Sequence, residues 1–177
     1  MSELTVAEDL KKYIRDIVDF PKEGIVFKDI TTLLSDSKAF KLAIDAMVLE
    51  FKNKNIEYVV GVEARGFLFG AVVAYLLDAG FVPVRKAGKL PYKRQSVTYD
   101  LEYGTDTVEI HEDAMPEGAR VLVVDDLLAT GGTIKAVADL VAAQKANIIS
   151  LAFLVELEFL NGKDRLTGYD TFTVLKY

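Results

Sequence analysis

Apolar residues in this chain of 177 residues fall into short runs that alternate with amphipathic stretches. Nearly continuous apolar runs are typical of parallel strands that are buried on both faces. We expect such strands over 58–62, 81–84, 121–124 and 147–155. Apolar positions at helical spacing predict helices over 36–51 and 134–143, and the long apolar run over 67–77 is expected to form a core helix. Strands that alternate with helices predict an α/β fold, with a mainly parallel sheet flanked by helices.

The N-terminal region is less regular. Leu10, Ile14 and Ile17 have helical spacing, which predicts a helix over 6–18. Proline and glycine in the segment that follows end this helix, and we expect residues 19–34 to form a small irregular hood.

A second irregular stretch covers residues 87–104, which show little apolar periodicity. Loops of that length in a compact domain are usually functional, so we expect a flexible lid here. Alternation over 105–111 predicts a half-exposed strand, and 169–175 is expected to form the last strand.

Composition narrows the class of protein. Half of the residues are apolar and no linker interrupts them, so we expect one domain over 1–177. The net charge of −6 argues against a nucleic-acid binder. The longest apolar run, 67–77, is too short to span a membrane, and the first residues do not look like a signal peptide. Since cysteine is absent as well, a cytoplasmic location is expected.

The most informative motif runs from Val121 to Thr133. Asp125 and Asp126 stand at the carboxyl end of a buried strand, and small residues lead from there into a helix. Ligands of parallel sheets bind at that end, and helix N-termini there attract phosphate. An ordinary strand-to-helix turn with solvated acids is the simpler interpretation. Nucleotide-binding motifs of the G-x-x-x-x-G-K-[ST] and G-x-G-x-x-G types are absent, so a sugar phosphate fits the motif best.

Positive charge is concentrated in one other segment. No acidic residue occurs from Ala79 through Tyr99, while Arg85, Lys86, Lys89, Lys93 and Arg94 lie within ten positions. Such a run is either a solvated basic loop or a site for a small, highly charged anion. The charges alone do not decide between the two.

The turns after three predicted strands, at 63–66, 85–89 and 125–133, should meet at one edge of the sheet. Together with the Phe-Pro segment at 20–21 and Leu-Glu-Tyr-Gly at 101–104, they make the chain resemble the type I phosphoribosyltransferases, in their order along the chain. The match is closest to members that act on adenine, and it extends from about residue 6 to the last strand.

The resemblance implies a pentosyltransferase of purine salvage. It would transfer phosphoribose from 5-phosphoribosyl 1-diphosphate (PRPP) to N9 of adenine with Mg²⁺, giving AMP and diphosphate through an oxocarbenium-like transition state. Mg²⁺ would be held mainly by diphosphate and ribose oxygens and by water rather than by protein ligands. A homodimer is implied too, in which Arg85 could act across the subunit interface.

The resemblance also assigns roles to residues of the central motif. Asp125 and Asp126 would bind the ribose hydroxyls and favour the cationic transition state. The turn would hold the 5′-phosphate through Ala129, Thr130, Gly131, Gly132 and Thr133. The diphosphate would be held by Arg65, Arg85, Lys86 and Lys89.

The acceptor base would lie against the hood. Phe27 would stack near it, and the main chain of Val26 and Lys28 would recognise its edge. Many members have arginine at the position of Lys28, and a guanidinium stacked on the base would not be replaced by lysine. On the lid, Glu102 would contact adenine and assist its proton, and Tyr103 would order the closed lid. Ordinary core packing for Phe27 and a solvated side chain for Glu102 are the competing interpretations.

Two other functions remain open from the sequence. A 6-oxopurine such as hypoxanthine or xanthine could be the acceptor. Its edge presents different hydrogen-bond donors and acceptors from that of adenine, and the sequence does not show which edge the pocket recognises. A regulator could keep the fold and sense PRPP without turning it over. Regulators of that kind normally carry a DNA-binding unit, for which the N-terminal helix is too short.

Overall fold

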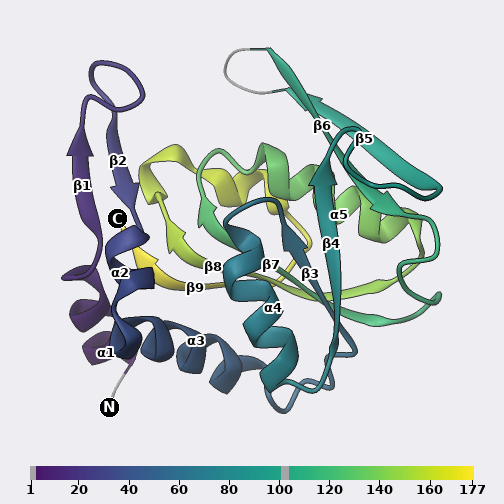
Figure 1. The fold of residues 1–177 in the computed structure, drawn as a ribbon, viewed down its shortest axis with the longest axis horizontal. Helices are drawn as coiled ribbons and strands as arrows, with labels where there is room; N and C mark the ends of the chain where they lie inside the picture. Colours follow the sequence, from purple (N-terminus) through teal and green to yellow (C-terminus); the bar gives the residue numbers. More distant parts are fainter. Residues whose placement is uncertain (1–2, 101–103) are drawn as a thin grey trace.

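A seven-stranded sheet forms the centre of the computed structural model, which describes residues 3–100 and 104–177. Its strand order is β5-β6-β4-β3-β7-β8-β9, and the five strands from β4 to β9 in that order are parallel. The strands are β3 (Tyr58–Val62), β4 (Gly80–Lys86), β5 (Arg94–Asp100), β6 (Thr105–His111), β7 (Arg120–Leu128), β8 (Asn147–Glu156) and β9 (Thr171–Lys176). The predicted α/β class is confirmed (Figure 1).

Helices cover both faces of the sheet. They are α1 (Glu3–Lys11), α2 (Thr31–Ser35), α3 (Ser37–Phe51), α4 (Gly66–Leu76) and α5 (Gly132–Ala143), with 3₁₀ turns η1 (Glu158–Leu160) and η2 (Gly162–Leu166). Leu122 and Val124 of β7 pack with α3 and α4 on one face, whereas Val121 and Val123 pack with α5 on the other. The central strand is therefore buried on both faces, as its apolar run predicts.

The prediction of a helix over 6–18 is wrong beyond residue 11. Arg15–Val18 forms β1, which pairs antiparallel with β2 (Val26–Asp29) in a separate two-stranded sheet. The pairing is fixed by contacts distant in sequence, such as the ion pair between Arg15 Nη2 and Asp29 Oδ2 at 2.6 Å. Helical spacing of a few apolar residues could not reveal it. Within the hood expected over 19–34, the irregular conformation is likewise wrong from residue 26 on, because this part contains β2 and most of α2.

The expected loop over 87–104 is also corrected. Arg94–Asp100 is strand β5, which pairs with β6 along its whole length in an antiparallel hairpin. Val97 and Tyr99 turn toward the core cluster that includes α5, while the alternate residues Ser96, Thr98 and Asp100 face solvent. Of the three inward positions Gln95 is polar, so the alternation is only a weak strand pattern. Residues 101–103 lie outside the described part.

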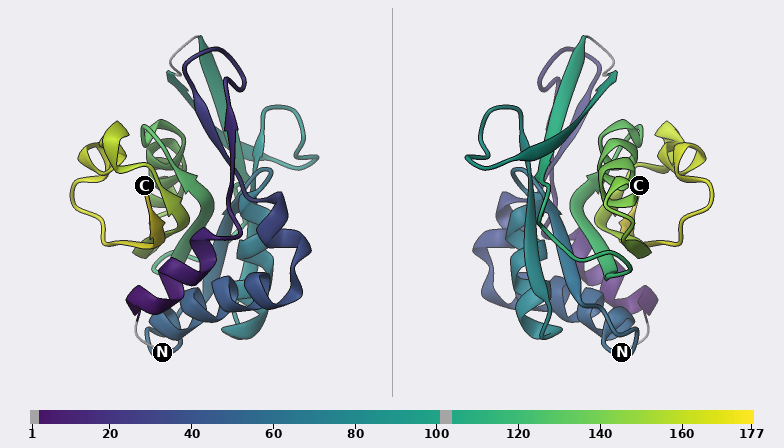
Figure 2. Two further views of the ribbon diagram at one scale, coloured as in Figure 1. Left: turned by 90° about the vertical axis from the view of Figure 1, so that its left-hand side faces the viewer. Right: turned by 90° about the vertical axis from the view of Figure 1, so that its right-hand side faces the viewer.

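The β1–β2 and β5–β6 hairpins both project beyond the end of the sheet at which the parallel strands finish (Figures 1 and 2). The carboxyl ends of β3 and β7 thus lie between two hairpins that are distant in sequence, one N-terminal and one from the middle of the chain. Within the described residues, no helix has the length and apolar character needed to cross a membrane.

Candidate active site

A cavity of about 340 Å³ opens at the carboxyl ends of β3 and β7. Parallel strands bring their following turns together at this edge, which explains why residues distant in sequence share the cavity. It is lined by Val62, Glu63, Ala64, Arg65, Lys86 and every residue from Asp125 to Ile134. The three turns predicted to converge therefore do so.

Two neighbouring carboxylates form one wall of the cavity. The backbone N–H of Asp126 donates to Oδ1 of Asp125 over 2.9 Å. Arg65 Nε lies 2.9 Å from Oδ2 of Asp126, an ion-pair distance at which the N–H is not aimed well enough for a hydrogen bond. The chain at Gly66 lies directly against Asp125. Glycine is needed there, because a Cβ would lie 2.8 Å from Oδ1 of Asp125.

Both carboxyl groups are held where ionisation is unfavourable. Burial raises the pKa of Asp125 well above its ordinary value, and the charge of Asp126 raises it further. Burial also raises the pKa of Asp126, although Arg65 opposes that effect. Two adjacent acids with raised pKa values in a cavity are typical of a functional site.

The small-residue turn after β7 leads directly into α5. Gly131 caps the helix in the left-handed conformation, with φ of 81°. A Cβ on Gly131 would collide with the carbonyl oxygen of Gly162, so the turn packs directly on the backbone at the start of η2. The first N–H groups of α5 have no acceptors within the helix and lie along the cavity, an arrangement that binds anions.

Glu63 connects the other two turns. Its carboxylate accepts hydrogen bonds from the Lys89 ammonium, from the backbone N–H of Lys86 at 2.9 Å and from Arg85 Nε at 3.3 Å. Burial by itself would raise the pKa of Glu63, but the bonds from Lys89, Lys86 and Arg85 lower it to about 2. The carboxylate therefore stays charged and holds the basic segment against the cavity.

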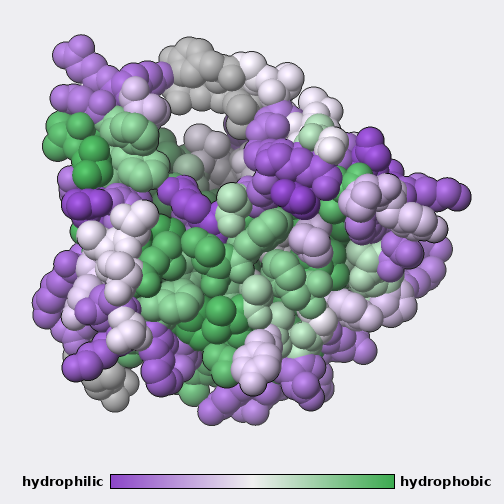
Figure 3. Space-filling view, in the orientation of Figure 1, coloured by the Kyte–Doolittle hydropathy of each residue, from purple (hydrophilic) through white to green (hydrophobic). Residues whose placement is uncertain are grey.

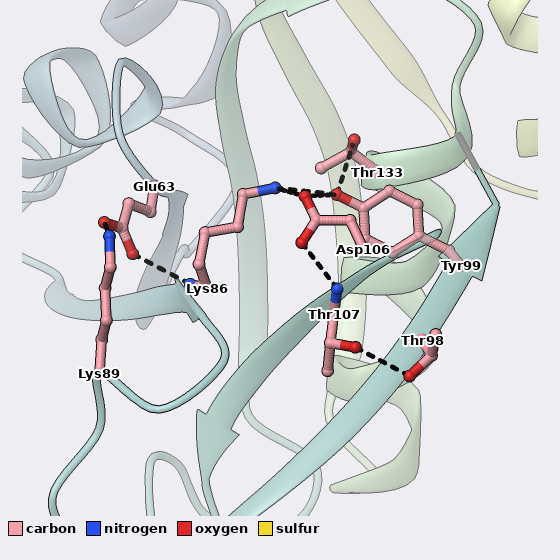
Figure 4. Close-up of polar contacts among 8 residues, drawn as sticks. All are labelled: Glu63, Lys86, Lys89, Thr98, Tyr99, Asp106, Thr107 and Thr133. Atoms are coloured by element: carbon pink, nitrogen blue, oxygen red, sulfur yellow. Dashed lines mark hydrogen bonds and ion pairs between the residues drawn. The ribbon is translucent and has the colours of Figure 1, made fainter. Parts of the chain in front are cut away.

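Lys86 takes part in a second network, shown in Figure 4. Its ammonium donates to Asp106 on β6 and to the Tyr99 hydroxyl on β5, the latter at 3.1 Å. Thr133, in the first turn of α5, donates to the same hydroxyl over 3.2 Å. The β5–β6 hairpin is thereby connected both to the basic segment and to the small-residue turn.

The family model of the phosphoribosyl transferase domain matches residues 31–174. The chain belongs to this family. Curated relatives include adenine phosphoribosyltransferases of Syntrophotalea carbinolica, 58% identical over 96% of this chain and 99% of the relative, and of Halothermothrix orenii, 55% identical over 95% and 99%.

Solved structures of phosphoribosyltransferases have the same fold. The adenine phosphoribosyltransferase of Thermoanaerobacter pseudethanolicus is 53% identical, with a TM-score of 0.93 over 97% of this chain and 99% of the other. The Saccharomyces cerevisiae enzyme is 41% identical, with a TM-score of 0.92 over 97% and 99%. Its structure contains adenine and an imino-altritol bisphosphate.

The phosphoribosyltransferase cavity brings together only part of the predicted site. Its lining includes Arg65, Lys86, Asp125, Asp126 and all five residues of the turn 129–133. Arg85 and Lys89 do not line it but reach its wall through Glu63. Glu102 and Tyr103 lie outside the described residues.

The β1–β2 hairpin approaches the cavity through aromatic contacts rather than as part of its lining. The guanidinium carbon of Arg65 lies 5.4 Å from the centre of the Phe27 ring, and Phe20 meets Phe27 edge to face at 5.2 Å. Lys28 points elsewhere: its Nζ lies 2.7 Å from Asp16 Oδ1 and 4.1 Å from the centre of the Tyr177 ring. Its side chain therefore does not take the place of a stacked guanidinium beside Phe27.

Glu63, Tyr99 and Asp106 are site residues to which the sequence interpretation gave no role. Tyr99 was assigned to a loop, and Asp106 to a half-exposed strand with no chemical role. The alternation of Gln95, Val97 and Tyr99 was the available signal, since it places Tyr99 on the inward face of a strand. No comparable signal existed for Asp106.

Proposed function

We propose that this phosphoribosyltransferase uses adenine as its acceptor and forms AMP and diphosphate from adenine and PRPP. The cavity carries the proposal: a carboxylate pair faces an anion-binding helix N-terminus, and cations surround both. The relatives named as adenine phosphoribosyltransferases support adenine as the base. In this proposal the whole chain, residues 1–177, forms one domain of the enzyme.

The turn 129–133 and α5 would hold the 5′-phosphate, with the Thr130 and Thr133 hydroxyls beside the backbone N–H groups. This places the ribose over Asp125 and Asp126, whose oxygens accept from its hydroxyls. As the bond to diphosphate lengthens, positive charge grows on the sugar. Ionised carboxylates whose charge burial disfavours would then gain an opposite charge, so they stabilise the transition state more than the ground state.

The leaving diphosphate would be received by Arg65, Lys86, Arg85 and Lys89. In the ligand-free arrangement each of these cations is paired with an acid. Diphosphate carries more charge than a carboxylate and can displace it as an acceptor. The cations thereby stabilise the charge that accumulates on the leaving group.

Mg²⁺ fits the same cavity. Oδ2 of Asp126 is buried and accepts no hydrogen bond, although it forms an ion pair with Arg65; a hard cation could take it as a ligand once Arg65 turns to the diphosphate. The described residues contain no cluster of three or more metal-ligating side chains, and diphosphate, ribose and water would supply most of the ligands. When bound, the metal would neutralise charge on the diphosphate.

The base would lie on the side of Phe27, where its ring could be covered by an aromatic face and its edge met by main-chain groups of Val26 and Lys28. We assign Glu102 and Tyr103 to the lid that would close over this base.

A homodimer is supported by α4, which leaves Leu68, Tyr75 and Leu76 exposed on a face where apolar side chains gather (Figure 3). A cytoplasmic location suits a chain without cysteine.

The deciding experiment is the rate of nucleotide formation from PRPP and Mg²⁺ with adenine, hypoxanthine or xanthine as acceptor. We expect AMP to form at least about 100-fold faster than either 6-oxopurine product, because a wrong base leaves buried polar groups unpaired. Equal rates would refute the assignment of adenine. Binding of PRPP without any product would instead indicate a sensor.

A further inference from the structure

Asp106 is fixed so that one of its oxygens faces the cavity cations. Its Oδ1 accepts from the backbone N–H of Thr107 over 2.8 Å, which orients the carboxylate on β6. Its Oδ2 accepts a hydrogen bond from the Lys86 ammonium and lies 3.5 Å from the Tyr99 hydroxyl. Figure 4 shows that Tyr99 stands between Asp106 and Thr133.

The direction of each hydrogen bond at Tyr99 follows from its partners. An ammonium can only donate and a carboxylate can only accept, whereas a phenol has one proton and two lone pairs. The Tyr99 hydroxyl therefore accepts from Lys86 and Thr133 and donates toward Asp106. In this arrangement the proton of the Thr133 hydroxyl is directed at Tyr99 and away from the cavity.

The charges on this pair are stable at neutral pH. Partial burial disfavours both charges, but the bond to Asp106 raises the pKa of Lys86 overall. The bond from Lys86 in turn lowers the pKa of Asp106. Both side chains are about one third exposed to solvent, so a ligand can reach the ion pair and compete with it.

PRPP would need hydrogen bonds from the same two donors, the Thr133 hydroxyl and the Lys86 ammonium. A 5′-phosphate on the turn 129–133 accepts only, so the Thr133 proton must turn toward it. Tyr99 can then stay in contact with Thr133 only by donating to it, which withdraws its proton from Asp106. A diphosphate at Lys86 competes for the ammonium in the same way.

We propose that Asp106 is a positioning residue whose carboxylate holds Lys86 and, through Tyr99, Thr133 in the ligand-free arrangement, in competition with the phosphate groups of PRPP. The proposal rests on the proposed placement of PRPP at Lys86 and Thr133. Asp106 thus weakens the binding of PRPP and assists the return of both donors when diphosphate leaves.

The test is the dissociation constant of PRPP with Mg²⁺, measured by isothermal titration calorimetry on the full chain without adenine. Asp106→Asn and Asp106→Ala each remove the competing charge, and we expect both to lower the constant about two- to fivefold, the effect of one partly exposed ion pair. The matched control is Asp139→Asn on α5, which breaks the exposed pair between Lys135 and Asp139 with the same change of net charge. It should change the constant by less than about 1.5-fold.

A double-mutant cycle shows whether Asp106 acts through Lys86. Lys86→Met should weaken PRPP binding, and adding Asp106→Asn to it should then have much less effect than in the wild type, because the ion pair is already gone. In steady-state assays, the Asp106 variants should lower KM for PRPP with kcat within about twofold.

Each outcome decides the proposal. Weaker binding in both Asp106 variants, or a change no larger than that of Asp139→Asn, overturns it. If only one of them folds, as judged by its thermal unfolding curve, that one decides. A chain that binds PRPP but forms no AMP would refute the proposed function and leave this result intact.

Discussion

Glu63→Gln tests how strongly one carboxylate holds the basic segment against the cavity. The pKa of Glu63 falls from 4.5 to about 2 in the folded chain, which at about 1.36 kcal/mol per pH unit corresponds to about 3 kcal/mol. Its partners Arg85 and Lys89 are a third to a half exposed, so solvent screening reduces this value. We expect the variant to lose about 1–3 kcal/mol of unfolding free energy at pH 7.

The pH dependence follows from the direction of the pKa change. Because the pKa is lower in the folded than in the unfolded state, the stabilisation is complete above about pH 4.5 and is lost as pH falls toward 2. The difference in unfolding free energy between wild type and Glu63→Gln should therefore shrink by roughly 40% between pH 7 and pH 3.5.

Urea unfolding followed by circular dichroism at both pH values measures this difference. The control is Glu117→Gln, which breaks the exposed pair between Glu117 and Lys145 at 2.9 Å and should cost less than about 0.5 kcal/mol. A Glu63→Gln loss equal to that of the control would refute the reasoning. A loss that does not depend on pH would assign the effect to packing instead of charge.

Three further variants test the site. Asp125→Asn should lower kcat about 100-fold while raising the unfolding free energy in urea, because burial already disfavours the charge; a variant as active as wild type would contradict the assigned role. Gly131→Ala should be less stable than Gly118→Ala and should raise KM for PRPP, since both have φ of 81° but only Gly131 faces the backbone of Gly162; equal thermal shifts would argue against that contact. Lys28→Met should leave KM for adenine within about twofold of wild type, because the side chain points away from Phe27, and a large increase would show that the ammonium contacts the base.

The fold was predictable where local pattern and tertiary environment agree. The buried runs of β3 and β7 and the amphipathic α5 are specified by their own residues, so their type could be predicted from sequence. Asp36 could likewise be recognised as a helix start, and it accepts from the N–H groups of Lys38 and Ala39. By contrast, β1 and β5 owe their conformation to partners across a hairpin, which periodicity within one segment does not reveal.

The candidate site, too, has a part that was predictable from the sequence and a part that was not. Convergence of the three turns follows from the topology of a parallel sheet, so Arg65, Lys86 and the Asp125–Thr133 segment could be grouped in advance. The acids that hold the cations could not. Glu63 is 22 residues from Arg85, and Asp106 is 20 residues from Lys86, and only the folded chain brings them together.

The pairing of every predicted diphosphate-binding cation with an acid has a consequence for encounter rates. A site of nearly balanced charge, on a chain of net charge −6, projects little positive potential into solution. PRPP should arrive by ordinary diffusion at a rate that depends only weakly on ionic strength, and the attraction develops at contact, once its phosphates compete with the acids at short range.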